Sequence, residues 1–110
     1  MKNIHIIAGR LGKDAETRQV GENTVTSFSV ATDDNYKDKN GNWVENTDWI
    51  NITIWNPSQT VKSLSKGDLI IAEGKVKTRQ YEDANGVKKY STSTVCKSVR
   101  KLNKDEEAAF

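Results

Sequence analysis

The sequence predicts an all-β domain, and three observations predict it. Apolar and polar residues alternate with a period of two along most of the chain, as strands require. Asn-Gly pairs at residues 40–41 and 85–86 are strong signals for hairpins. One stretch, Ser58 to Lys66, has apolar residues at helical spacing, Val61 and Leu64. The chain should therefore form strands joined by hairpins, with one short helix.

The alternation also gives the order of the elements. Residues 33–48 are polar and predict a long, mobile loop or ribbon. If Asn85 and Gly86 form a two-residue turn, Tyr81 faces Tyr90 across the last hairpin. Three strands, a short helix and two strands are the order of the five-stranded Greek-key barrel called the OB-fold, with a small open sheet as the alternative. The expected strands are residues 3–8, 24–32, 49–55, 68–82 and 87–95, followed by a short one at 97–102.

Length and composition restrict the class of protein. The 110 residues suffice for one domain, and 35% hydrophobic against 29% charged residues give a small core and a charged surface. No window approaches the ~18 consecutive apolar residues of a membrane span. Cys96 is the single cysteine and cannot form an internal disulfide. We therefore expect a soluble, cytoplasmic protein with no membrane partner.

The charges are unevenly distributed, although the net charge is only +2. Residues 1–74 carry eight basic and ten acidic side chains, residues 75–104 carry nine and two, and residues 105–110 carry none and three. A basic segment followed by an acidic tail indicates a polyanion site in the basic segment.

The third strand places large aromatics on a polar face. Ile50, Ile52 and Ile54 alternate with Trp49, Asn51, Thr53 and Trp55, so the isoleucines should face the core and the tryptophans the solvent. Their rings would lie roughly 20 Å apart and would suit stacked nucleobases. The alternative is that both rings bend inward, into the core or an oligomer interface.

A basic stripe follows on the fourth strand. Lys75, Lys77, Arg79 and Tyr81 share one face, which would track a phosphate backbone and end in a stacking ring. An ordinary solvated edge is the alternative. Tyr36 and Trp43 in the polar ribbon are further stacking candidates. Tyr36 is the better one because Lys37 and Lys39 lie beside it.

The residues do not favour catalysis, a metal or a cofactor. His5 is the only histidine, so neither a metal cluster nor a histidine-based triad can form. Residues 9–14, GRLGKD, lack the spacing of a phosphate-binding P-loop. The same residues match the GXXG of KH domains, but a strand precedes them where that domain has a helix.

Several segments together resemble the bacterial-type single-stranded DNA-binding protein family over residues 1 to about 102. They are GRLGKDAETR, FSVAT, YKDKNGNW, TDWINITIWN and KGDLIIAEGKVKTRQYEDANG. The resemblance implies an OB-fold without enzymatic activity that binds single strands without sequence preference. It also implies a homotetramer, with a dimer as the alternative, acting in replication, recombination and repair within the cytoplasmic nucleoid.

The family's aromatic positions carry over onto this chain. The ribbon tryptophan falls on Tyr36, the third-strand tryptophan and phenylalanine on Trp49 and Trp55, and the long-hairpin tryptophan on Tyr81. Ile50 stands where the family often has a histidine, near a subunit contact.

The last residues resemble a partner-binding tip. We expect a DNA-binding domain at residues 1–102 and an acidic tail at 103–110. Asp105, Glu106, Glu107 and Phe110 resemble the family's acidic tip, which recruits replication and repair proteins, but its proline and linker are missing. The alternatives are a frayed, solvating tail and a tip that competes for the basic groove.

The sequence therefore predicts a protein that binds single-stranded DNA. Tyr36, Trp49, Trp55 and Tyr81 would stack bases, and Lys75, Lys77, Arg79, Lys37 and Arg10 would neutralise phosphates. An RNA-binding or a protein-interaction OB module is the alternative function.

Overall fold

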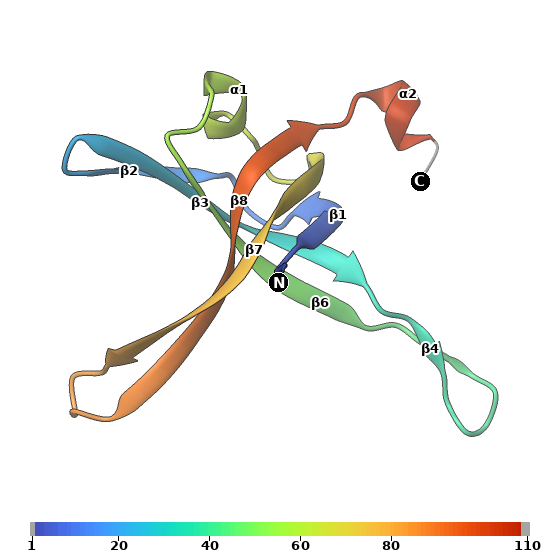
Figure 1. Cartoon of the computed structure of the whole chain (residues 1–110). Coiled ribbons are helices and arrows are strands. Elements are labelled where there is room, and N and C mark those ends of the chain that lie inside the picture. Colours follow the sequence, from blue (N-terminus) through green and yellow to red (C-terminus); the bar gives the residue numbers. More distant parts are fainter. Residues whose placement is uncertain (1, 109–110) are drawn as a thin grey trace.

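The computed structural model describes residues 2–108 and confirms the all-β prediction (Figure 1). Two helices of one turn each, α1 (Gln59–Lys62) and α2 (Lys104–Glu107), accompany the strands. No helix in residues 2–108 is long and apolar enough to cross a membrane. The strands are β1 (His5–Leu11), β2 (Glu16–Val20), β3 (Asn23–Asp33), β4 (Tyr36–Lys37), β5 (Trp43–Val44), β6 (Thr47–Trp55), β7 (Leu69–Glu82) and β8 (Lys88–Lys101).

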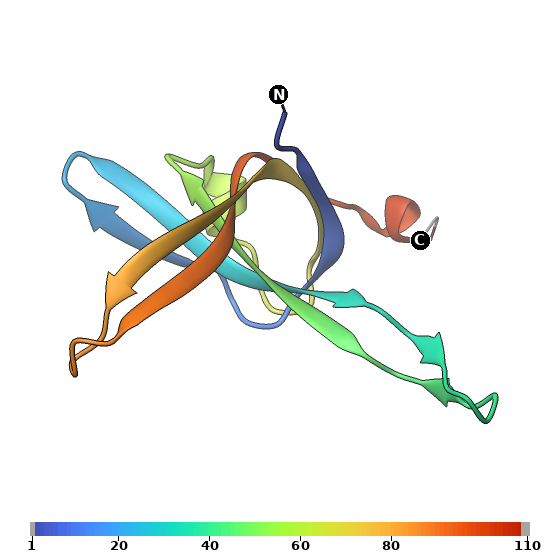
Figure 2. The ribbon, with the colours of Figure 1, turned by 60° about the horizontal axis from the view of Figure 1, so that its bottom comes forward.

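The strands pair in a ring. The order is β1-β7-β8-β6-β3, and β3 returns to β1 through the pairs Arg10 with Ala31 and Leu11 with Val30. Within residues 2–108, only β6 and β8 pair in parallel. Three hairpins extend beyond the ring: β2–β3, β4–β5, which prolongs β3 and β6, and the outer half of β7–β8. Figure 2 shows the ring end-on, with β4–β5 projecting to one side and the other two hairpins to the opposite side.

The core fills the ring, and the sequence alternation located it correctly. Ile52 and Ile54 of β6 are buried, and Ile50 packs against the core at its margin. The helix expected between Ser58 and Lys66 is confirmed as α1, whose Val61 joins the core cluster together with Leu64. The other buried members of this cluster are Ile7, Leu11, Phe28, Val30, Ile70, Ala72 and Cys96.

Two glycines allow the backbones of the ring to approach closely. A Cβ on Gly9 would lie 2.3 Å from the carbonyl oxygen of Ala31, and one on Gly74 would lie 2.2 Å from that of Val95. Gly74 also borders the irregularity in the β7–β8 register. The expected end of the first strand at residue 8 is therefore wrong. The strand continues through Gly9 to Leu11, because glycine lets it cross close to β3.

The turn predicted at Asn85-Gly86 exists, but its register differs from the predicted one by one residue. The N–H of Gly86 donates to the carbonyl of Asp83 (3.0 Å), and the N–H of Asp83 donates to that of Val87 (3.0 Å). Three residues therefore form the loop, with Gly86 at φ +76°. As a result Tyr81 pairs with Lys89 and not with Tyr90. The two tyrosines lie on opposite faces of the hairpin.

Other elements departed from the sequence expectation. β2 was not predicted, because its sequence ETRQV has no apolar alternation and is exposed throughout. The two strands expected at 87–95 and 97–102 are one continuous strand, β8. The tail, for which fraying was one expectation, forms α2 with a capping box between Asn103 and Glu106.

Candidate nucleic-acid interface

A groove lies between the outer face of the β2–β3–β6 sheet and the inner half of the β7–β8 hairpin. Trp55 stands in it together with Lys77 and Arg79 from β7. Six further lining residues have small polar side chains, namely Ser27, Ser29, Asn51, Thr53, Ser91 and Ser93. The groove thus combines an aromatic ring, small polar groups and four cations, against which two carboxylates, Asp14 and Glu16, also line it.

The sheet register explains why these groups meet. Trp55 pairs with Val25, and Val25 pairs with Arg18 of β2, so the three side chains form one row on one face. Sequence reasoning missed Arg18 because it missed β2. Gly21 was the available signal, because a hairpin turn around it brings Arg18 beside Val25. Lys13 also lines the groove and was missed.

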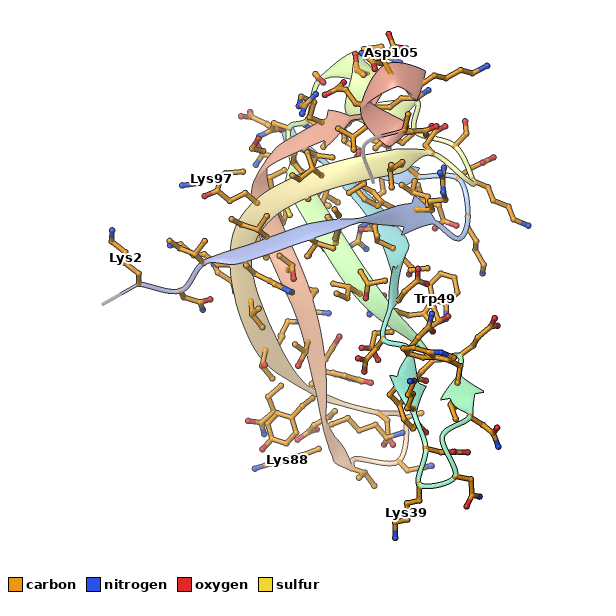
Figure 3. All side chains as sticks on the ribbon, turned by 90° about the vertical axis from the view of Figure 1, so that its right-hand side faces the viewer. Lys2, Lys39, Trp49, Lys88, Lys97 and Asp105 are labelled. Atoms are coloured by element: carbon orange, nitrogen blue, oxygen red, sulfur yellow. The ribbon has the colours of Figure 1, made fainter. Side chains whose placement is uncertain are left out.

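Both tryptophans of β6 point outward, as the alternation predicted. Trp49 is 59% exposed and Trp55 is 47% exposed, so neither ring lies in the core of the chain. The ring of Trp49 lies against Gly12, where a Cβ would come within 2.4 Å of a ring carbon. The six-membered ring of this indole therefore lies close to the backbone at Gly12. Figure 3 shows Trp49 where β6 leaves the ring.

The basic stripe of β7 is exposed on one face, opposite Ser91 and Ser93 of β8. Lys77 and Arg79 line the groove with Trp55, whereas Lys75 lines a second hollow beside Lys97. Tyr81 is exposed further out on the hairpin and does not line the groove. The structure thus brings the middle of the stripe, Lys77 and Arg79, to Trp55 and leaves Lys75 and Tyr81 apart from it.

The ribbon presents side chains to both of its faces. Tyr36 pairs with Val44 and Lys37 with Trp43, so the side chains of Tyr36 and Lys37 point in opposite directions. Tyr36 is exposed, and the ammonium of Lys37 lies 5.3 Å from the centre of the Trp43 ring. This distance is that of a cation–π contact.

Arg10 lies with the acidic tail and not with the groove. Its guanidinium donates to the carbonyl of Gly67 (2.9 Å) and pairs with Glu107 (3.3 Å). Glu106 pairs with Arg100, and the hydrogen bond from Arg100, followed by that from the backbone of Asn103, lowers the pKa of Glu106 below its ordinary value. Asp105 is exposed, and Phe110 lies outside the described residues.

No metal-binding cluster of three His, Cys, Asp or Glu side chains occurs between residues 2 and 108. Cys96 is buried in the core, and burial raises the pKa of its thiol to about 11. Since the thiolate is the nucleophilic form, this thiol is inert at neutral pH.

The comparisons with known proteins agree with this geometry. A family model described as "Single-strand binding protein family" matches residues 2–102. The chain belongs to this family. The family resemblance found in the sequence is thereby confirmed.

Relatives and solved structures extend the match to the single-strand binding proteins of other organisms. The "Single-stranded DNA-binding protein" of Neisseria meningitidis is 36% identical over 104 residues, which are 91% of this chain and 59% of that protein. The chain therefore spans less than two thirds of that relative's length. The mitochondrial protein of Drosophila melanogaster is 36% identical over 100 residues, 88% of this chain and 68% of that one.

The solved structures confirm the OB-fold. A "Plasmodium falciparum SSB complex with ssDNA" superposes with a TM-score of 0.82 at 25% identity, over 94% of this chain and 97% of that one. A deletion mutant of the single-stranded DNA binding protein from Thermus aquaticus superposes with a TM-score of 0.79 at 22% identity, over 94% and 51%. The second likeness concerns the fold alone.

Proposed function

We propose that this chain binds single-stranded DNA without sequence preference and without catalysing a reaction. The observation that carries the proposal is Trp55, half-exposed on a polar sheet face, in one groove with Lys77 and Arg79. An indole offers a stacking surface to any base, and cations beside it offer sites for phosphates. The proposed stacking residues are Tyr36, Trp49, Trp55 and Tyr81, and the proposed phosphate contacts are Lys75, Lys77, Arg79, Lys37 and Arg10.

The lining of the groove supports a single strand as the ligand. Its small hydroxyl and amide side chains, such as Ser27, Asn51 and Thr53, leave room for bases beside the indole. They also form no rigid pattern of donors that would select one base. Arg18 and Lys13 add two cations on the far side of Trp55 and extend the proposed phosphate track.

The names of the relatives point the same way. The proteins of Neisseria and Drosophila are single-stranded DNA-binding proteins, and the Plasmodium structure is a complex with ssDNA. We carry this ligand over to the present chain, together with a role in replication, recombination and repair at the nucleoid in the cytoplasm.

We also propose a homo-oligomer, a tetramer with a dimer as the alternative. Among residues 2–108, the backbone of His5–Gly9 pairs on one side only, with β7. Ile4 and Ile6, at this open edge, are 59% and 62% exposed. An unpaired edge with exposed apolar side chains favours strand addition from a second copy of the chain.

The domain division follows from the same proposal. Residues 1–102 form the DNA-binding domain, and residues 103–110 form the tail that would recruit replication and repair proteins. Glu106 and Glu107 pair with Arg100 and Arg10 of the same chain. A partner for the acidic tail must displace these ion pairs, which cost little to break because they are exposed.

The test is a titration with oligo-dT that follows tryptophan fluorescence. Trp55→Ala should weaken binding by ~1–3 kcal/mol, the contribution of one stacked base, whereas Trp55→Phe should retain most of the affinity. The wild-type affinity should fall with salt. Thermal unfolding of each variant checks the fold.

Three results would contradict the proposal. A folded wild type that oligo-dT neither quenches nor shifts in a gel would exclude single-strand binding. Preference for oligo-U over oligo-dT would favour the RNA-binding alternative. A tight protein partner that competes for Trp55, without any nucleic-acid binding, would favour the protein-interaction module.

A further inference from the structure

The ribbon prolongs the β3–β6 ladder without any change of register. The last pair of that ladder is Asp33 with Thr47, and the ribbon resumes with Tyr36 opposite Val44. Two residues separate these pairs on each strand, so neither strand contains a bulge. The link is partly bonded, because the N–H of Asp34 donates to the carbonyl of Asn46 (2.9 Å).

This continuity decides which face of the ribbon continues the face of the groove. Side chains alternate along a strand, so Trp43 has the same parity as Trp49 and Trp55. The three indoles follow one another at intervals of six residues, about 20 Å each along an extended strand. Tyr36 and Val44 have the opposite parity and continue the face that bears Ile50.

Burial does not explain why position 43 is a tryptophan. It is 70% exposed, and the ribbon is a single hairpin with no second layer. Val44, the half-buried apolar residue next to it, points to the other face. The cation of Lys37 covers part of the ring and restricts its orientation, while most of the ring surface stays open to solvent.

We propose that Trp43 stacks on a base of the single strand, as the outermost member of a row formed by Trp43, Trp49 and Trp55. This proposal rests on the proposed function and adds a contact to it. Lys37, besides its proposed phosphate contact, then acts as a positioning residue that holds the indole. Tyr36 offers a ring to the other face of the same ribbon.

The charges of the ribbon support stacking as the source of its affinity. Residues 33–48 carry five acidic side chains and two basic ones, so they repel phosphates on balance. A base that stacks on Trp43 gains contact with an aromatic face and releases no counterion. Loss of the ring should therefore lower the affinity and leave the salt dependence unchanged.

The experiment compares Trp43→Ala, Trp43→Phe and Val44→Ala with the wild type, using the anisotropy of a labelled oligo-dT. An oligonucleotide of about 20 nucleotides exceeds the site size of a single OB-fold and can reach the ribbon. Trp43→Ala should weaken binding roughly 5- to 150-fold, the range for one lost stacked base, with an unchanged slope of log affinity against log salt. Trp43→Phe should retain most of the affinity, and Val44→Ala on the opposite face should match the wild type.

Two results would overturn the inference while the proposed function stands. One is equal binding by Trp43→Ala and the wild type. The other is a loss of affinity that light scattering traces to a lower oligomeric state, which would make Trp43 a contact between copies. If the wild type itself does not bind oligo-dT, the proposed function fails first, and this inference fails with it.

Discussion

Two of the hairpins that project from the ring, the ribbon and β7–β8, have the same tip. In the ribbon, Asp38 accepts hydrogen bonds from the N–H groups of Asn40 and Asn42 through its carboxylate (both 2.9 Å). In the β7–β8 hairpin, Asp83 accepts from Asn85 (2.9 Å) and Val87 (3.0 Å) in the same way. Both tips read Asp-X-Asn-Gly, and both glycines have positive φ. A short local sequence thus builds the same turn in two places.

The strands behind the tips differ. β7 and β8 pair without interruption from Val76 to the tip, whereas the ribbon holds only two strand pairs beyond its link to β3 and β6. Residues 75–95 carry five basic and two acidic side chains, and the ribbon carries the reverse excess. The same turn sequence therefore closes two hairpins that differ in strand pairing and in charge. One is a stiff basic arm suited to phosphates, and the other is a looser acidic ribbon suited to stacking.

The largest expected effect lies at the base of the basic arm. In Gly74→Ala the new Cβ would lie 2.2 Å from the carbonyl oxygen of Val95 and 2.6 Å from the Cα of Cys96. Backbone atoms cannot move aside as a flexible side chain can, so the variant should lose about 1–3 kcal/mol of unfolding free energy. Urea denaturation measures this loss.

Gly41→Ala in the ribbon is the matched comparison for Gly74→Ala. A Cβ there meets no atom of residues 2–108 within 4 Å, but φ is +81° and strains any side chain. This strain should fray the ribbon tip and leave the global midpoint nearly unchanged. Equal global losses in the two variants would show that the ribbon is as integral to the fold as the arm.

The next effect concerns electrostatics. Lys77→Ala combined with Arg79→Ala should reduce the slope of log affinity against log salt by about 1.4, since each phosphate contact to a single strand contributes about 0.7. Lys37→Gln, which removes a single proposed phosphate contact, should reduce the slope by about 0.7. Binding titrations over a range of salt concentrations measure both.

The control for the arm is Lys62→Ala with Lys66→Ala, which removes the same charge in and next to α1, outside the groove lining. If this control changes the slope as much as the arm variant, the net charge and not the groove governs binding. An unchanged slope in Lys37→Gln would contradict the phosphate contact proposed for Lys37 and leave it only the role of positioning the Trp43 ring.

The smallest expected effect is the pH dependence of the turn at the tip of the β7–β8 hairpin. The hydrogen bond from the N–H of Val87, helped by Asn85 and Lys89 and opposed by burial, lowers the pKa of Asp83 below its usual value. A carboxyl whose pKa falls on folding stabilises the fold above its unfolded pKa, and this contribution disappears as pH falls through the folded pKa. Protection of the Val87 amide from hydrogen exchange should therefore persist at the usual carboxyl pKa and decline only below it. A decline centred at or above that pKa would contradict the assignment.

Much of the fold could be predicted because burial repeats along each strand. The alternation in residues 49–55 identified both the buried Ile52 and Ile54 and the exposed tryptophans. β2 could not be found in this way, because a wholly exposed strand carries no alternation. Because β2 was not found, Arg18 could not be placed in the groove either. The predicted pairing of Tyr81 was also wrong, because Asn-Gly fits both two- and three-residue loops. Only the backbone hydrogen bonds of Asp83 decide between the two loops.

The sequence by itself determined the all-β class, the faces of β6, the single helix in the middle of the chain and the positions of both turns. These features depend on neighbours within a few residues, where side-chain parity and turn chemistry act. The tertiary structure decided which cations reach Trp55 and that Arg10 pairs with Glu107. It also decided that the ladder continues without a bulge, so that Trp43 lies on the same face as Trp49. Such contacts depend on register between strands distant in sequence, and hydrogen bonding across the sheet fixes that register only once the ring has assembled.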